Sequence, residues 1–252
     1  MAFDDSVQPM EPAQTGLPSR EGRIPWGQAD IIKAIGLVIL GTVIFLIPAA
    51  IAVAIIDQPN SDAETLAGLV PSLALEVLLL VLAVRFTLGK YRCSWRDLGF
   101  RLPARGGWWL PPLLVVVGWI IVGVYFAIVS ALGAGDLESQ SQFPDEAFQS
   151  PVVIPVVAVL ALIAAPITEE TFFRGFIFVG LRRRWGLVGA AFASGILFGL
   201  AHVLPILYIP FALIGVLFAL GYVYSGSLWV PMAAHFLFNS ISFIASVAVG
   251  GS

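Results

Sequence analysis

Seven long apolar runs dominate this chain of 252 residues. Each run is long enough to cross the hydrocarbon core of a bilayer, which needs roughly 20 residues of helix. Backbone polar groups in lipid must find hydrogen-bond partners within the protein, so runs of this kind are expected to form helices. The sequence therefore predicts an all-α fold: a polytopic transmembrane helical bundle with about seven membrane helices.

The predicted membrane helices follow one another through short connections. They are expected at residues 31–56, 66–86, 110–132, 151–181, 187–204, 206–224 and 228–247. The fourth run is long, and it contains Pro155 and Pro166, residues of a type that breaks or kinks helices. A break within that run would give eight membrane helices.

The composition supports a membrane protein. Apolar residues make up 59% of the chain and charged residues 12%, whereas a soluble domain is about half apolar and about a quarter charged. The single cysteine, Cys93, excludes an intramolecular disulfide and a cysteine-rich zinc site. The net charge of -3 comes without a broad basic surface, so no nucleic-acid partner is expected.

The N-terminal segment differs from the rest of the chain. Residues 1–25 are polar, acidic and proline-containing, without the basic start and apolar core of a signal peptide. Because it has few apolar groups to bury, this segment cannot offset the entropy that is lost on ordering. It is therefore predicted to be a disordered cytoplasmic tail. Residues 26–252 are predicted to form a single transmembrane helical domain.

Basic and acidic residues alternate between the predicted loops. Loops on the side of the N-terminus hold the basic residues, an arrangement that predicts a cytoplasmic N-terminus in a multi-pass protein of a cell membrane. Those basic residues are Arg20, Arg23, Lys33, Arg85, Lys90, Arg92, Arg96, Arg101, Arg105, Arg182, Arg183 and Arg184. The opposite loops hold Asp57, Asp62, Glu64, Asp136, Glu138, Asp145 and Glu146.

Ionisable residues inside the apolar runs are the main functional signal. Inserting such a residue into a membrane helix costs about 2.5–3.5 kcal/mol of free energy on insertion scales. Each is therefore a candidate functional residue by default. Most of them fall in the C-terminal half, which contains both histidines of the protein. The set is Glu76, Glu169, Glu170, Arg174, His202 and His235, with Asn239 as a hydrogen-bonding companion.

The two adjacent glutamates are predicted to have different partners. Neighbouring residues point about 100° apart on a helix, so Glu169 and Glu170 cannot face one spot. Arg174 follows Glu170 by four residues, a spacing and order that favour an ion pair. Glu169 is left without a local cation and is the candidate general base. The alternative is a structural ion network of all three.

The histidines extend the candidate site. His202 could hold and deprotonate a water together with Glu169, although a lone histidine on an apolar face is often a core residue. His235 and Asn239 are four residues apart on one helix face, from which both could donate to an oxyanion. Helix–helix hydrogen bonding is the alternative for this pair. Taken together, the four residues favour hydrolysis.

Other catalytic classes fit the sequence poorly. The chain has no G-x-S-x-G nucleophile elbow and no H-E-x-x-H zinc helix. No cofactor and no metal are expected, although two histidines and a glutamate could still bind a metal ion.

Three stretches resemble the signature of the CAAX-protease and bacteriocin-processing (CPBP, Abi) family of intramembrane glutamate proteases. They are EETFFR at 169–174, FGLAH at 198–202 and HFLFN at 235–239, and the resemblance covers about residues 150–245. It implies a metal-independent hydrolase in which Glu169 and His202 activate water. The resemblance further implies that His235 and Asn239 form the oxyanion hole and that Glu170 and Arg174 support the site.

The resemblance implies an intramembrane endopeptidase, expected in a prokaryotic cell membrane, that acts on a membrane-associated peptide or protein. The alternative is a non-catalytic membrane scaffold or bacteriocin-immunity factor of the same fold. A transporter is a further alternative, in which Glu76 would line a polar path. A hydrogen bond from Glu76 to a neighbouring helix is the favoured interpretation of that residue.

Overall fold

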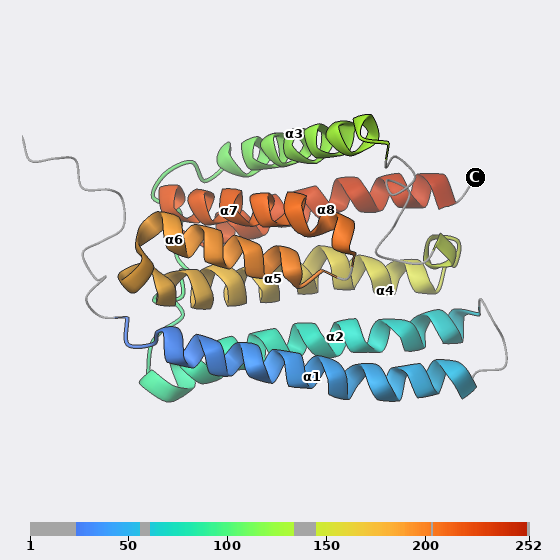
Figure 1. Cartoon of the computed structure of the whole chain (residues 1–252), viewed down its shortest axis with the longest axis horizontal. Helices are drawn as coiled ribbons and strands as arrows, with labels where there is room; N and C mark the ends of the chain where they lie inside the picture. The colour runs from blue at the N-terminus through green and yellow to red at the C-terminus, as the bar shows by residue number, and fades with distance from the viewer. Residues whose placement is uncertain (1–23, 56–60, 134–144, 203, 251–252) are drawn as a thin grey trace, which may run out of the picture.

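The computed structural model describes residues 24–55, 61–133, 145–202 and 204–250, and within them it contains helices and no strand. The helices run roughly parallel to one long axis and form a bundle (Figure 1). Most of the predicted disordered tail lies outside the described residues, as do Arg20, Arg23, Asp57, Asp136 and Glu138.

The long helices match the predicted spans closely. They are α1 (Gln28–Ile55), α2 (Asp62–Val84), α3 (Leu110–Ala131), α6 (Val179–Leu200), α7 (Tyr208–Ser225) and α8 (Trp229–Gly250). Between α3 and α6 lie the shorter helices α4 (Val153–Val159) and α5 (Ala165–Glu170). Three π-helical segments, Arg85–Gly89, Leu160–Ala164 and Thr171–Phe178, and two 3-10 turns, Asp145–Phe148 and Pro205–Leu207, complete the described secondary structure.

Six helical stretches in the described chain are long and apolar enough to cross a membrane. One of them, Val153–Leu200, has 48 residues, about 70 Å of straight helix, which is more than twice the thickness of a bilayer core. It is interrupted at Gly186 (φ 67, ψ -176). The Ser194 hydroxyl then donates to the carbonyl of Phe173 at 2.8 Å. The chain therefore doubles back at Gly186 (Figure 1), so this long stretch holds both the fourth and the fifth predicted spans. The six stretches are roughly consistent with the predicted count of about seven helices.

The two prolines of the fourth span do not divide it. Pro155 stands in the first turn of α4, where its missing N–H has no intrahelical partner to lose. Pro166 lies in the first turn of α5, directly after the π-helical segment Leu160–Ala164. Such segments change the hydrogen-bond ladder locally, and the helix continues through them. The eight-helix alternative is therefore not needed.

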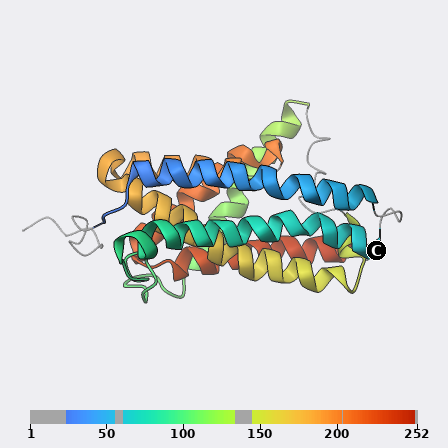
Figure 2. The same ribbon diagram turned by 90° about the horizontal axis from the view of Figure 1, so that it is seen from below.

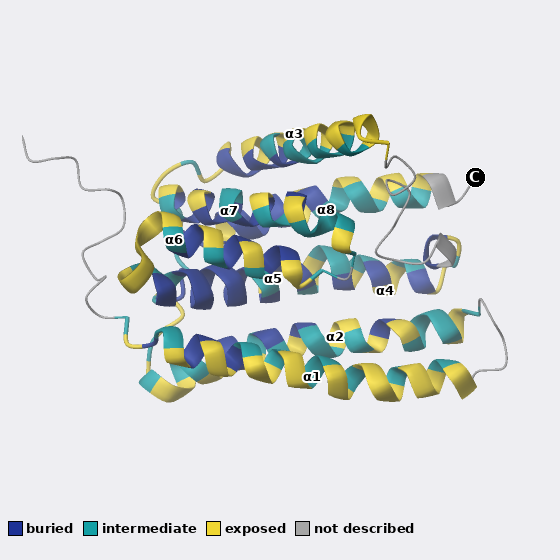
Figure 3. Ribbon diagram, viewed as in Figure 1, coloured by how far each residue is buried: buried dark blue, intermediate teal, exposed yellow. Residues whose placement is uncertain are grey.

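The segment before the reversal is the centre of the bundle. All eight residues of Thr171–Phe178 are buried, as expected for a helix surrounded by other helices. By contrast, α1 and the outer face of α3 expose many apolar side chains (Figure 3). In a bilayer these faces would contact lipid tails.

Helices α6 and α7 pack closely through glycines. A Cβ added at Gly215 would lie 2.7 Å from the Cα of Gly195, and one at Gly199 would lie 2.4 Å from the Tyr208 carbonyl oxygen. Small residues allow this close approach of membrane helices. The α6–α7 pair thereby fixes the position of His202, which follows α6, and of the Gly215 carbonyl.

Charge is segregated along the bundle. The start of α1, the loop at 92–109 and the turn at Gly186 share one end, and the described basic loop residues lie there (Figure 1). Asp62 and Glu64 begin α2 at the other end. The two described chain ends also lie at opposite ends (Figure 2). The assignment of the basic end to the cytoplasm stays a prediction.

Candidate active site

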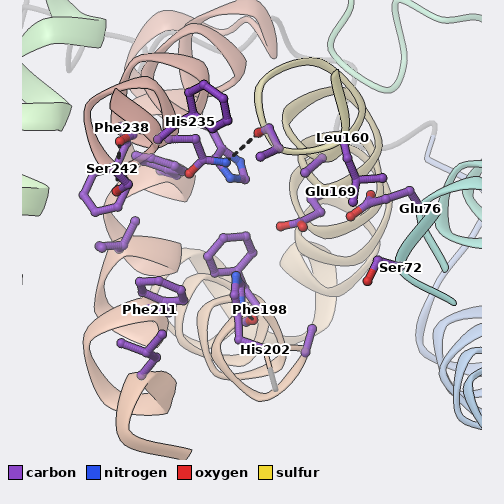
Figure 4. Close-up of a pocket in the computed structure, with 18 of the residues that line it drawn as sticks. Ser72, Glu76, Leu160, Glu169, Phe198, His202, Phe211, His235, Phe238 and Ser242 are labelled. Carbon is purple, nitrogen blue, oxygen red and sulfur yellow. Dashed lines mark hydrogen bonds between the residues drawn. The ribbon is translucent and has the colours of Figure 1, made fainter. Parts of the chain in front are cut away.

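A cavity of about 420 Å³ opens inside the bundle among α2, α3, α5, α6, α7 and α8. It is lined by all four predicted catalytic residues, which come from elements far apart in the sequence. In Figure 4, Glu169, His202 and His235 face the same space. The four residues are Glu169, His202, His235 and Asn239.

Glu169 lies on α5 and is only partly buried, whereas its neighbour Glu170 is completely buried. Its carboxyl group points into the cavity (Figure 4). One buried oxygen, Oε2, has no hydrogen-bond partner among the described residues. The two glutamates therefore have the different surroundings that the helix geometry predicts.

Glu170 and Arg174 form the predicted ion pair. Nη1 of Arg174 lies 2.8 Å from Oε1 of Glu170, and both side chains are fully buried. Nη2 donates to the Gly215 carbonyl at 3.1 Å. The guanidinium also stacks over the rings of Phe198 and Phe218, at 4.3 Å and 5.4 Å from their centroids. These contacts replace water around a charge that would otherwise be costly to bury.

His235, on α8, contacts the same carboxylate. Its Nδ1 lies 3.1 Å from Oε1 of Glu170. An ionised carboxylate only accepts hydrogen bonds, so Nδ1 is the donor. The other ring nitrogen, Nε2, is left for a ligand in the cavity. This nitrogen carries a proton only when the ring is an imidazolium, for which Glu170 is the adjacent counter-charge.

His202 has a different hydrogen-bond partner. Its Nδ1 lies 2.8 Å from the carbonyl oxygen of Phe198, one turn earlier. A carbonyl only accepts, so Nδ1 donates and Nε2 of the neutral ring keeps its lone pair. The ring is held between Phe198 and Phe211, with centroids at 5.0 Å and 4.4 Å. His202 can therefore accept a proton or orient a water at Nε2.

Asn239 follows His235 by one turn on α8. Its Nδ2 donates to the Ala161 carbonyl at 2.8 Å, within the π-helical segment Leu160–Ala164. This bond joins α8 to the helix that carries Glu169. A carboxamide has two N–H donors, so one remains for a ligand. Asn239 can therefore hydrogen-bond to the neighbouring helix with one N–H and donate to an oxyanion with the other.

Two residues contribute more to the site than their sequence pattern predicts. Phe198, the first residue of the FGLAH stretch, contacts both imidazoles as well as Arg174. Glu76 accepts a hydrogen bond from the Thr168 hydroxyl on α5, in agreement with the favoured interpretation of that residue, and it also lines the cavity. Its ionisable side chain within an apolar run was the only signal for it.

No group of three or more His, Cys, Asp or Glu side chains in the described parts of the chain is arranged to hold a metal ion. The metal alternative therefore has no ligand cluster among these residues.

The fold and cavity define a helical membrane protein with a Glu/His/Asn site inside the bundle, and sequence comparison shows what this part of the chain is similar to. Residues 151–241 match the family model "Type II CAAX prenyl endopeptidase Rce1-like". That range includes all three motifs, and the match supports the predicted resemblance of this part of the chain to the CAAX-protease family.

A curated relative supports this assignment. The Bacillus subtilis (strain 168) protein named "Putative membrane peptidase YdiL" is 27% identical over 129 residues, which cover 48% of this chain and 53% of the relative. The chain thus matches about half the length of that protein. No solved structure matches the chain.

Proposed function

We propose that this protein is a membrane peptidase, and more specifically a glutamate-type intramembrane endopeptidase that hydrolyses a peptide bond of a membrane-associated substrate. The observation that carries the proposal is the convergence of Glu169, His202, His235 and Asn239 on one cavity. The family match and the name of the curated relative support the same class of reaction.

In this mechanism Glu169 and His202 hold a water molecule in the cavity. Glu169 takes one proton from the water while the water oxygen bonds to the carbonyl carbon of the substrate. The carbonyl π electrons move to the oxygen, which becomes an oxyanion. Glu169 then passes the proton to the amide nitrogen, and the C–N bond breaks to release an amine and a carboxyl product.

His235 and Asn239 stabilise the oxyanion in this mechanism. Nδ1 of His235 is committed to Glu170, so Nε2 donates only from an imidazolium ring. Such a ring is a charge-assisted donor, and the Glu170 carboxylate balances its charge. The second donor is the Asn239 N–H that the Ala161 carbonyl does not use. This arrangement gives the Glu170–Arg174 pair a supporting role.

The lining of the cavity favours a substrate that arrives from the membrane. Away from the polar cluster its walls are largely aromatic and aliphatic, as in most pockets for apolar ligands. These walls include Trp119, Phe126, Phe148, Phe211, Phe238 and Phe243. A peptide that is attached to the bilayer or inserted in it fits this apolar surface. The proposed setting is a prokaryotic cell membrane, with the N-terminus of the enzyme on the cytoplasmic side.

The test begins with mass spectrometry of membrane peptides that accumulate in cells when Glu169 is replaced by Gln. A peptide found in this way, tethered to liposomes, is then the substrate for purified protein. Glu169→Gln and His202→Ala should each lower kcat by about 10²–10⁴-fold, the usual contribution of a proton-transfer group. Chelators should have no effect.

Ser240→Ala is the matched control, because Ser240 neighbours Asn239 on α8, is only partly buried, and its hydroxyl donates to the Phe236 carbonyl in its own helix. It should cleave like the wild type. Full biological effect of Glu169→Gln in cells would instead support a non-catalytic scaffold or immunity factor.

A further inference from the structure

Glu76 brings the N-terminal half of the chain into the candidate site. It lies on α2, outside the segment 151–241 that matches the family model. Only 9% of the residue is exposed, and it lines the same cavity as Glu169. The two carboxyl groups lie next to each other (Figure 4) and within hydrogen-bonding reach.

The hydrogen bonds of this pair require a proton. An ionised carboxylate has acceptors only, so two of them cannot bond to each other. The Thr168 hydroxyl is directed to Oε2 of Glu76, whereas Oε2 of Glu169 is buried and has no donor within the described chain. One proton between the two carboxyl groups would supply the missing hydrogen bond.

The surrounding charges favour the same protonation state. Facing the pair are Glu170 on α5, Arg174 on the following π-helical segment, His235 on α8 and His202 after α6. With both Glu76 and Glu169 ionised, three carboxylates would face only Arg174 and an imidazolium at His235, because Nε2 of His202 keeps its lone pair in the proposed mechanism. With one proton shared, the two remaining negative charges balance Arg174 and an imidazolium at His235. Buried charges are tolerated when they are balanced in this way.

We propose that Glu76 shares one proton with Glu169 and holds it when Glu169 acts as the general base. The proton on Glu76 then donates to one carboxylate oxygen of Glu169. The other oxygen of Glu169 is left to take the proton of the attacking water. Glu76 is thus a positioning residue, and this role rests on the function proposed above.

Infrared spectroscopy of the purified protein tests proton sharing without reference to activity. At neutral pH the wild type should show the C=O stretching band of a protonated carboxyl group. Glu76→Gln and Glu169→Gln should each abolish or shift this same band, whereas Ser72→Ala should leave it unchanged. Ser72 is a suitable control because it lines the cavity one turn before Glu76 on α2. A spectrum unaltered by Glu76→Gln, or two bands that respond independently, would overturn the proposal.

Kinetics test the positioning role. The amide of Glu76→Gln can donate to Glu169 permanently, so kcat should stay within a few-fold of the wild type at neutral pH. Glu76→Leu removes the donor and should lower kcat by about 10²-fold, the loss expected from a misplaced catalytic group, with little change in KM. Equal losses in both variants, or wild-type kcat in Glu76→Leu, would refute the role. An inactive wild type with the predicted infrared result would refute the peptidase function alone.

Discussion

Oε1 of Glu170 accepts hydrogen bonds from two cations or potential cations: Nη1 of Arg174 at 2.8 Å and Nδ1 of His235 at 3.1 Å. This one oxygen joins the central helix to α8. The other oxygen, Oε2, is buried without a hydrogen-bond partner in the described structure. The two donors therefore draw the negative charge of Glu170 toward Oε1, the oxygen nearest His235. A positively charged imidazolium at His235 would be stabilised by that charge.

Replacing Glu170 by Gln should destabilise the protein strongly. The change leaves the buried guanidinium of Arg174 without its counter-charge, and breaking one partner of a buried pair typically costs about 3–5 kcal/mol. The measurement is the thermal unfolding midpoint of purified protein in detergent. Asp62→Asn is the control, since Asp62 is exposed in the first turn of α2, and its midpoint should stay near that of the wild type. A wild-type midpoint for Glu170→Gln would mean that Arg174 is compensated in another way.

Phe198→Ala should affect both stability and catalysis. Its ring supports the guanidinium of Arg174 and contacts the imidazoles of His202 and His235. Loss of a buried phenylalanine ring costs about 3–5 kcal/mol, and both histidines would lose a wall of their site. Unfolding midpoints and peptide cleavage are the two measurements.

The control for Phe198→Ala is Phe192→Ala on the same helix. Phe192 is 50% exposed on the outer surface, so its removal should leave cleavage unchanged. If the two variants had the same unfolding midpoint and the same cleavage rate, the contacts of Phe198 with the site would not contribute to stability or catalysis.

The membrane spans and the ion pair of Glu170 with Arg174 were predictable because each depends on local sequence. A run of apolar residues identifies a helix without knowledge of its neighbours, and the spacing of Glu170 and Arg174 sets their relative position on one helix. The reversal at Gly186 also falls in the gap left between the predicted spans 151–181 and 187–204.

The partners across helices were not predictable in the same way. The contact of Glu76 with Thr168 and Glu169 depends on how α2 is rotated against α5, and apolar periodicity does not specify this rotation. The hydrogen bond of Asn239 to the Ala161 carbonyl depends on a π-helical segment that the sequence did not indicate. The close approach of α6 and α7 fixes His202, and it too emerges only from packing.

Gly195→Ala should disturb the site from a distance. The new Cβ would lie 2.6 Å from the Ala212 carbonyl oxygen and 2.9 Å from the Val216 backbone nitrogen. Neither backbone atom can move alone, so α6 and α7 must separate, at a cost of about 1–3 kcal/mol for overpacking. We expect a lower unfolding midpoint and reduced cleavage. Gly123→Ala on α3 is the control, because nothing lies within 4 Å of its added Cβ. A Gly195→Ala protein indistinguishable from this control would contradict the tight α6–α7 packing.

The single cysteine offers a test of orientation. Cys93 follows the π-helical end of α2 at the basic end of the bundle. If that end is cytoplasmic, a membrane-impermeant maleimide should label Cys93 in inverted vesicles and not in intact cells. A Cys93→Ser protein carrying Asp62→Cys at the opposite end should show the reverse pattern. Labelling of Cys93 in intact cells would place the N-terminus outside and reject the predicted topology.

The rate of that labelling should depend on pH in a specific direction. Burial, followed by the nearby Asp97 carboxylate, raises the pKa of the Cys93 thiol, and the thiolate is the reactive form. The thiolate fraction at neutral pH is therefore smaller than for a free thiol, whose pKa is about 8.5. Labelling of the folded protein should keep accelerating at alkaline pH values where a free thiol has levelled off. Denatured protein should label faster at neutral pH, because unfolding removes both causes. Equal pH profiles for folded and denatured protein would show that the loop does not shield Cys93.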